Sequence, residues 1–360
     1  MNVAREVRVL LVEDSRSQRE TLAWVIRNAP GLTLVGEAEN GAQAVDMVAQ
    51  LAPDVVLMDC HMPVMDGIAA TREIMSRYPT PIIVTSATYE TTDVHPGMEA
   101  LREGALAIAP KPLDPTSDDF DKMAEELRLT LRLLADVKVA RLNSAGSPTE
   151  SPIPPLPRPS LPIYRPRRDV QIIVIGASTG GPPVLLDILR RIRPELDVPV
   201  VLVQHICAGF TAGFAGWLSR SAGLPVEIAR AGAPAKPGCV YVAPENCHLG
   251  MNASARFVLD EGPPEDGFRP SVSHLFRSTA AAFGPNALAI LLTGMGQDGA
   301  EGMSCIAREG GATVVQDRES SVVFGMPNAA IQRGAAQRIL PPRDIARFVL
   351  TQLAARRVTS

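Results

Sequence analysis

Short apolar runs alternate with amphipathic segments along the first third of the chain. The runs occupy residues 7–12, 32–38, 54–59, 81–87 and 105–110, and segments with helical spacing lie between them, at residues 17–29, 42–52 and 67–77. Uninterrupted apolar runs of this length are typical of strands buried on both faces of a parallel sheet. The pattern therefore predicts an α/β domain of (βα)5 type with a parallel sheet over residues 1–135.

The same alternation returns in the second half of the chain. Apolar runs lie at residues 170–175, 198–203 and 287–292, and a helical segment at residues 184–192 follows the first of them. A second α/β domain is expected over residues 169–355.

Proline separates the two patterned regions. The chain has 32 prolines, and eight of them fall between Pro148 and Pro166. Because proline removes a backbone donor and fixes φ, neither a helix nor a sheet persists at this density. Residues 136–168 are therefore expected to form a partly extended, Pro-rich linker.

Composition and charge narrow the class of protein. Hydrophobic residues make up 46% of the chain and charged residues 21%, which is typical of globular domains. No apolar run approaches the about 18 residues of a membrane span, so membrane insertion is not expected. Five cysteines without a CxxC pair fit a cytoplasmic protein better than a disulfide scaffold.

The charge is distributed unevenly along the chain. Residues 1–135 contain 12 basic and 21 acidic residues, whereas residues 169–360 contain 17 basic and 16 acidic residues. An acidic domain joined to a nearly neutral one lacks the basic face of a nucleic-acid-binding protein. We therefore expect no nucleic-acid partner, and we interpret the basic linker as a solubilising spacer.

Polar residues lie within or directly after the carboxyl-terminal parts of four predicted strands of the first domain. They are Glu13, Asp14, Asp59, Thr85 and Lys111. The carboxyl ends of parallel strands meet at one edge of a sheet, where ligands bind. Three carboxylates at such an edge repel one another unless a hard cation such as Mg²⁺ is present. A lysine and a hydroxyl nearby would bind the oxygens of a phosphoryl group on one carboxylate.

The blocks VEDS, DCHMPVMDG, VTSA and APKP resemble those of response-regulator receiver domains over residues 5–135. The resemblance implies that Asp59 accepts a phosphoryl group from a histidine kinase. Glu13, Asp14, Asp59 and the carbonyl of His61 would hold Mg²⁺, while Thr85 and Lys111 would contact the phosphate.

Two features of the sequence depart from the receiver pattern. The position that is usually aromatic in the fifth strand is Ile108, which puts an aromatic switch in doubt. Residues 91–97 contain Pro96 and predict an irregular or shortened fourth helix.

The second domain opens with a candidate nucleophile. The apolar run at residues 170–175 leads into Gly176-Ala177-Ser178-Thr179-Gly180, which fits G-x-S-x-G, a turn that exposes a serine at the top of a sheet. The segment lacks both the G-x-G-x-x-G pattern and a P-loop lysine, so a phosphate-binding loop is disfavoured. On this motif alone, a nucleophile and a structural turn remain equally open.

A serine nucleophile needs a base and an orienting acid. His205 follows the run at 198–203 and is the preferred base, whereas His248 and His274 have the positions of surface or capping residues. Asp298 lies in a glycine-rich turn after the run at 287–292, where an oxyanion hole can form. The order Ser–His–Asp differs from that of α/β-hydrolases, so that fold is not expected.

The blocks GASTGG, VQHI, RPSV, TGMGQDG and VVFGMP resemble those of the chemotaxis-type protein-glutamate methylesterases, the CheB family, over most of residues 170–340. The resemblance implies a doubly wound α/β catalytic domain in which Ser178 is the nucleophile, His205 the base and Asp298 the orienting acid. Thr179 and the backbone near Met295 would line the oxyanion region. No cofactor is expected for this domain.

The resemblance also implies an activity and its regulation. The enzyme would hydrolyse glutamate methyl esters on chemoreceptors and deamidate receptor glutamines, and the unphosphorylated receiver would cover the esterase site. We expect a monomer. A signalling adaptor that only binds receptors is the alternative, although it would have no need of the three catalytic residue types. A DNA-binding output domain is disfavoured by the absence of a basic recognition helix.

Overall fold

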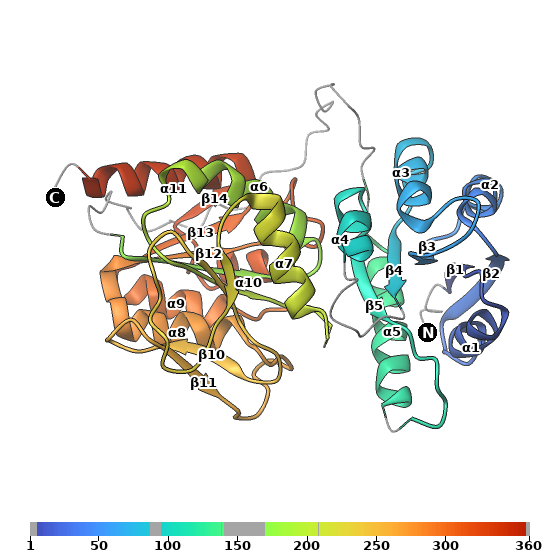
Figure 1. Cartoon of the computed structure of the whole chain (residues 1–360), viewed down its shortest axis with the longest axis horizontal. Helices are drawn as coiled ribbons and strands as arrows, with labels where there is room; N and C mark the ends of the chain where they lie inside the picture. Colours follow the sequence, from blue (N-terminus) through green and yellow to red (C-terminus); the bar gives the residue numbers. More distant parts are fainter. Residues whose placement is uncertain are drawn as a thin grey trace. The chain divides into compact units, whose positions relative to one another are not determined.

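The computed structural model describes residues 6–86, 95–117, 119–137, 139, 170–207 and 209–357. The chain divides into two compact units, which comprise residues 1–150 and 151–360. Figure 1 shows the elements of each unit. Almost all of the predicted linker, residues 136–168, lies outside the described residues. Each unit is therefore described by itself.

The N-terminal unit is a five-stranded parallel sheet with helices on both faces, as the apolar pattern predicts. The strand order is β2-β1-β3-β4-β5. Helix α1 packs against α5, while α2 packs against α3 and α3 against α4. The elements are β1 (Val7–Val12), α1 (Arg16–Arg27), β2 (Leu32–Ala38), α2 (Gly41–Leu51), β3 (Val55–Asp59), α3 (Gly67–Arg77), β4 (Ile82–Ser86), α4 (His95–Arg102), β5 (Ala107–Pro110) and α5 (Phe120–Leu134).

The fourth helix of this unit is short, in agreement with the sequence. Helix α4 has eight residues and begins at His95; residues 91–94 of the segment expected to be irregular lie outside the described residues. Ile108 lies in β5, is 9% exposed, and occupies the space beside Gly97 of α4. An aliphatic side chain thus packs between β5 and α4, at the position that is usually aromatic in the pattern that the sequence resembles.

The C-terminal unit is built on a seven-stranded parallel sheet of order β14-β13-β12-β6-β7-β9-β8, with a separate antiparallel pair, β10-β11. Its strands are β6 (Ile172–Ala177), β7 (Val200–Gln204), β8 (Val226–Ile228), β9 (Val240–Val242), β10 (His248–Met251), β11 (Phe257–Asp260), β12 (Ala287–Leu291), β13 (Ala312–Gln316) and β14 (Arg338–Leu340). Its helices are α6 (Gly181–Ile192), η1 (Arg193–Glu195), α7 (Thr211–Ala222), α8 (Val272–Phe283), η2 (Gly284–Asn286), α9 (Ala300–Arg308), α10 (Met326–Gln332) and α11 (Pro342–Arg357).

Helices cover both faces of this sheet, so the expected doubly wound architecture is confirmed. Helix α6 packs against α7 and α11, and α8 packs against α9, which packs against α10. Figure 1 shows these two groups of helices on either side of the sheet, with the β10-β11 pair next to α8. The central strands β6, β7 and β12 are fully buried, as strands covered on both faces must be.

Each sheet has a point between two central strands from which the chain winds toward opposite edges. In the N-terminal sheet it lies between β1 and β3, and in the C-terminal sheet between β6 and β12. Crevices for ligands form outside the carboxyl ends of the strands at such points. The residues that follow β1, β3, β6 and β12 therefore mark the candidate sites.

Two further expectations from composition can be compared with the structure. None of the described helices combines the length and apolar character that crossing a membrane requires. The five cysteines all lie in the described part of the chain and form no disulfide there.

The packing of α8 against α9 depends on a glycine. A Cβ atom at Gly302 would lie 2.6 Å from the Ser273 carbonyl oxygen and 2.7 Å from the Phe276 Cβ. Alanine normally stabilises a helix by up to about 1 kcal/mol relative to glycine. We predict that Gly302→Ala instead lowers the free energy of unfolding by about 1–3 kcal/mol, because the helices must move apart.

The measurement is urea unfolding followed by tryptophan fluorescence in a Trp24→Phe background, so that only the buried Trp217 of this unit reports. Gly216→Ala on α7 is the matched control, since its Cβ would approach only the end of the Arg220 side chain, at 3.4 Å. Equal stability changes for the two variants would contradict the prediction.

Candidate active site

Ser178 lies in a tight turn between β6 and α6. Its backbone N–H donates to the Thr293 carbonyl at 3.0 Å, and its own carbonyl accepts from the Gly181 N–H at 2.8 Å. Gly180 is the N-cap of α6 and has a φ of +76°, a left-handed backbone conformation that favours glycine. The sequence thus folds into the strand, turn and helix that G-x-S-x-G predicts, with Ser178 at the carboxyl edge of the sheet.

His205 follows the neighbouring strand β7 directly, as predicted. Its backbone N–H donates to the Ala177 carbonyl at 2.9 Å. Gln204 joins the two strand ends, because its side-chain N–H₂ donates to the carbonyls of Ser178 at 2.9 Å and His205 at 2.8 Å. The imidazole Nε2 lies 2.9 Å from Asp298 Oδ2, while the buried Nδ1 has no hydrogen-bond partner among the described residues.

Asp298 is fully buried and accepts five hydrogen bonds. It lies at the N-termini of two helices, α8 and α9, whose backbone N–H groups favour an anion. The five donors and their distances are His205 Nε2 (2.9 Å), the Ser271 hydroxyl (2.8 Å) and the N–H groups of Val272 (2.7 Å), Ser273 (2.9 Å) and Gly299 (2.8 Å).

These donors decide the ionisation state of Asp298. Burial by itself raises the pKa of the carboxyl group, but the hydrogen bond and charge of His205 and the helical N–H groups outweigh it. The pKa of Asp298 is lowered to about 2 as a result. The carboxylate is therefore ionised at neutral pH and can orient the imidazole and stabilise its charged form.

The segment after β12 approaches Ser178 closely. A Cβ atom at Gly294 would lie 2.7 Å from the Ser178 Cβ, so only glycine allows this contact. Thr179 and Met295 are both half-buried at this edge, and the Thr293 hydroxyl donates to the Thr179 carbonyl at 3.0 Å. Within the described residues, the backbone N–H groups of Thr179 and Met295 have no protein acceptor.

The two other histidines of this unit have different environments. His274 lies in the first turn of α8, where its N–H donates to the N-cap Ser271, as expected of a residue at a helix start. His248 was expected to be a surface or capping residue, and the surface alternative is excluded because His248 is 1% exposed. Its Nδ1 accepts from the Ser271 N–H at 3.2 Å, and its Nε2 lies 3.0 Å from the Pro263 carbonyl. Both ring nitrogens are thus engaged away from Ser178.

The strand-end residues of the N-terminal unit also come together. Lys111 Nζ lies 2.8 Å from both Glu13 Oε2 and Asp59 Oδ1, and all three side chains are buried. Thr85 pairs with Asp59 across β3 and β4, and its hydroxyl donates to the Met58 carbonyl at 3.4 Å. His61 lies two residues beyond Asp59 and is exposed.

The same edge carries an excess of negative charge. Carboxylate oxygens of Glu13, Asp14 and Asp59 lie within 4.8 Å of one another. Burial raises the pKa of Glu13, and the charge of Asp59 raises it further, although Lys111 opposes both effects. Three oxygen donors with one compensating lysine fit a hard divalent cation such as Mg²⁺.

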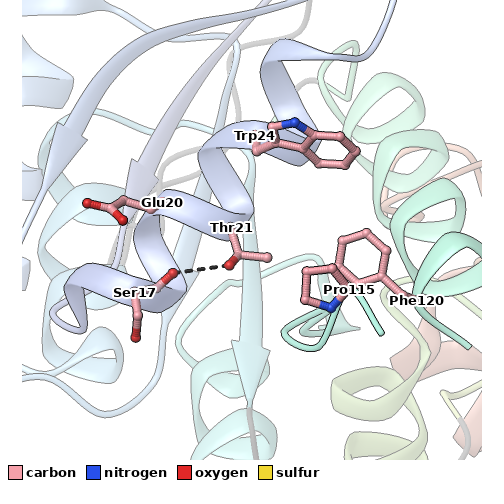
Figure 2. A pocket seen from close by; sticks show the side chains of 6 residues that line it. All are labelled: Ser17, Glu20, Thr21, Trp24, Pro115 and Phe120. Carbon is pink, nitrogen blue, oxygen red and sulfur yellow. Dashed lines mark hydrogen bonds between the residues drawn. The ribbon is translucent and has the colours of Figure 1, made fainter. Parts of the chain in front are cut away.

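A separate groove of about 500 Å³ lies between α1 and α5 of this unit. Figure 2 shows Trp24 near Phe120, with Pro115 beside Phe120 and Glu20 on α1. The Trp24 and Phe120 ring centroids are 6.2 Å apart, and Trp24 remains 52% exposed. None of the three clustered carboxylates lines this groove, so it is distinct from the charged edge.

Four contacting residues were not singled out from the sequence. Gln204 and Ser271 lie inside the blocks VQHI and RPSV, which could have drawn attention to them. Phe268, which stacks on His205, and Gln18, which accepts from Lys111 at 3.2 Å, gave no signal. Both of these come from segments other than the strand ends.

The comparisons with known proteins cover both units. The family described as response regulator receiver domain matches residues 9–117, and the family described as CheB methylesterase matches residues 173–349. Among solved structures, the catalytic domain of Thermotoga maritima CheB methylesterase is 38% identical, covers 51% of this chain and 98% of its own, and has a TM-score of 0.49.

Two curated relatives are similar over almost their whole length. The protein-glutamate methylesterase/protein-glutamine glutaminase 4 of Myxococcus xanthus (strain DK1622) is 43% identical over 340 residues, which cover 94% of this chain and 95% of that protein. The protein-glutamate methylesterase/protein-glutamine glutaminase 1 of Syntrophus aciditrophicus (strain SB) is 43% identical over 349 residues, with coverages of 97% and 98%. The chain therefore belongs to the CheB family of methylesterases that carry an N-terminal response-regulator receiver domain.

Proposed function

We propose that this protein is a phosphorylation-regulated protein-glutamate methylesterase, which hydrolyses γ-glutamyl methyl esters on chemoreceptors and releases methanol in chemotaxis-type adaptation. The observation that carries the proposal is the 2.9 Å contact between His205 and the buried Asp298, beside a serine at the next strand end. The names of its near full-length relatives support it. The proposed domains are a receiver at residues 1–135, a linker at 136–168 and a methylesterase at 169–355.

Ser178 is the nucleophile in this proposal. Its hydroxyl oxygen attacks the ester carbonyl while His205 Nδ1, the ring nitrogen that does not contact Asp298, takes the hydroxyl proton. The tetrahedral intermediate collapses to an acyl-enzyme, and the proton passes to the departing methanol. Water then attacks the acyl-enzyme with His205 as base, which frees the glutamate carboxylate and restores the serine.

The oxyanion of each tetrahedral intermediate needs preorganised donors. The backbone N–H groups of Thr179 and Met295 are the candidates, because both flank Ser178 and neither has a protein acceptor in the described structure. The close approach of Gly294 to Ser178 supports a role for the Met295 side of the site. No cofactor is needed for this chemistry.

Deamidation of receptor glutamine is a second activity that the same residues can perform. An amide and an ester form the same type of tetrahedral intermediate, and His205 would protonate departing ammonia in place of methanol. The names of both relatives include this activity.

Phosphorylation is proposed at Asp59, with a histidine kinase as the phosphodonor. Glu13, Asp14, Asp59 and the His61 carbonyl would hold Mg²⁺, which supplies charge neutralisation when bound. Thr85 and Lys111 would contact the phosphoryl oxygens. Lys111 already bridges Asp59 and Glu13, so it can follow the added charge without a large movement.

The proposed regulation is that the unphosphorylated receiver restricts access to the esterase site. The acidic receiver and the nearly neutral esterase permit such docking electrostatically. A domain equilibrium that shifts by about 1.4 kcal/mol changes activity tenfold. We further propose that the enzyme acts as a cytoplasmic monomer, without nucleic-acid binding or membrane insertion.

The first prediction concerns the nucleophile. Ser178→Ala should lower methanol release from a chemoreceptor fragment that carries glutamate methyl esters by roughly 10³-fold or more, because no other group replaces the serine. A fluorophosphonate probe should label the wild type and not this variant. Ser254→Ala, at an exposed serine, should behave as wild type. Labelling that does not depend on Ser178, or no labelling at all, would favour the alternative function, a signalling adaptor that only binds receptors.

The second prediction concerns Asp298 and pH. Its folded pKa of about 2 lies below the ordinary value of about 3.9, so the stabilisation from its ionised form is complete above about pH 4 and is lost as pH falls through 2. Asp298→Asn should cost about 2 kcal/mol of unfolding free energy at pH 6, and the difference from wild type should shrink toward pH 2. Its kcat should fall by roughly 10³–10⁴-fold.

Urea unfolding at a series of pH values measures the stability difference. Asp260→Asn serves as the control, since Asp260 is exposed and accepts a backbone hydrogen bond from Gly262. A stability difference that stays constant between pH 6 and 2 would show that the ionised form is not what Asp298 contributes.

The third prediction concerns regulation. In the presence of Mg²⁺ and a small-molecule phosphodonor, methylesterase activity should rise about tenfold in the wild type. It should not rise in Asp59→Ala, because the acceptor is gone. Asp46→Ala, at an exposed carboxylate of α2, should respond like the wild type. An equal rate with and without phosphodonor in all three proteins would contradict the proposal that the unphosphorylated receiver restricts access to the esterase site.

A further inference from the structure

The imidazole of His205 is held on one face by an aromatic ring. The rings of His205 and Phe268 are stacked with centroids 3.8 Å apart and planes 4° from parallel. Aromatic pairs usually have centroids 4.5–7 Å apart, so this contact is unusually close. Its geometry leaves the imidazole no freedom to rotate toward Phe268.

A ring face also favours one protonation state of the imidazole. A cation over the face of an aromatic ring is attracted to it more strongly than a neutral group is. His205 becomes positively charged each time it takes a proton from Ser178 or from water. Phe268 therefore interacts more strongly with the form that exists during the reaction than with the resting form.

Phe268 is fixed by the residue at the other end of its turn. The backbone groups of Glu265 and Phe268 form a reciprocal pair, with the Glu265 N–H donating at 3.1 Å and the Phe268 N–H at 2.9 Å. Asp266 and Gly267 between them have φ of 50° and 85°, which closes the turn. The position of Glu265 thus sets the position of the Phe268 ring.

Glu265 is in turn bound to α8 by three side-chain contacts. Both of its carboxylate oxygens accept from Arg277 Nη2, at 2.8 and 2.7 Å, and its Oε1 lies 2.9 Å from His274 Nδ1. Arg277 also donates to Glu301 of α9 at 2.9 Å. The turn is therefore attached to the two helices whose N-termini hold Asp298.

The cluster of His248, Glu265 and His274 has the composition of a metal site, but its hydrogen bonds assign it a different role. Both nitrogens of His248 are engaged, and Glu265 is already neutralised by Arg277. A cation would have to displace the guanidinium and break one of the two His248 contacts. The cluster instead acts as the anchor of the turn that carries Phe268.

We propose that Phe268 is a positioning residue for His205, which fixes the imidazole plane and favours its protonated form, and that Glu265 anchors it to α8. This inference rests on the proposed methylesterase function. It adds a component that is supplied neither by the hydrogen bond from Asp298 nor by the oxyanion donors. The first arm of the test removes the π face with Phe268→Leu, retains it with Phe268→Tyr, and compares both with the wild type on the methylated chemoreceptor fragment.

Phe268→Leu should lower kcat roughly tenfold with KM changed less than about twofold, because the imidazole loses its orientation. The acid limb of its kcat/KM profile should move to lower pH by about half a unit, because the protonated imidazole loses the ring face. Phe268→Tyr should restore both quantities. A purely structural role would not move the pH profile.

The second arm leaves the ring in place. Glu265→Gln removes the charge that binds Arg277 and should lower kcat by roughly threefold, whereas Glu261→Gln, at an exposed glutamate of the same segment, should have no effect. Thermal melts check that each variant is folded. The inference is overturned if Phe268→Leu and Glu265→Gln match the wild type while Ser178→Ala is inactive, or if Phe268→Tyr fails to restore the Phe268→Leu defect. Failure of the proposed function differs from both, since the wild type itself would then release no methanol.

Discussion

The methylesterase site depends on one buried charge, the carboxylate of Asp298. An ionised carboxylate removed from water costs several kcal/mol unless donors replace its hydration. Here five donors do so, and three of them are backbone N–H groups at the starts of α8 and α9. Satisfying this single group fixes where both helices begin and where the imidazole edge of His205 must lie. The hydrogen bonds to Asp298 therefore determine both the position of the His205 imidazole and the packing of α8 and α9 on one face of the domain.

The receiver handles its carboxylates in the opposite way. Among the residues that the structure describes, its strand-end edge gathers Glu13, Asp14 and Asp59 around one lysine, so the negative charge there exceeds the positive charge. The edge is consequently suited to accept a cation and a phosphoryl group that come and go. In the methylesterase domain, by contrast, Asp298 is saturated by fixed donors. At the same kind of point between two central strands, one parallel sheet thus holds carboxylates suited to reversible ligands, and the other holds a carboxylate whose donors are all part of the protein.

Most of the fold and the positions of the proposed catalytic residues could be predicted from the sequence, because both follow from buried parallel strands. The runs at residues 7–12 and 32–38 coincide with β1 and β2, and Ser178, His205 and Asp298 all follow central strands. What escaped prediction comes from connections instead. Phe268 and Ser271 lie between β11 and α8, and only the folded chain brings them to His205 and Asp298. His248 was expected to be a surface or capping residue because it follows a loop, and in the fold it is buried beneath the connection between β11 and α8.

The pairing of β6 with β7 has a consequence for how this enzyme can be switched. The two strands are hydrogen-bonded in continuous register as far as Ala177 and Gln204. The Gln204 side chain donates to the carbonyls of Ser178 and His205, the first residue after each strand. The proposed nucleophile, Ser178, and the proposed base, His205, thus lie at the ends of two strands that are paired directly. Any signal that separated them would have to break the centre of the domain, at a free-energy cost far above what one phosphoryl group supplies. We therefore expect control of this catalyst to act on whether the substrate reaches the site, with Ser178 and His205 in the same relative positions in the on and off states.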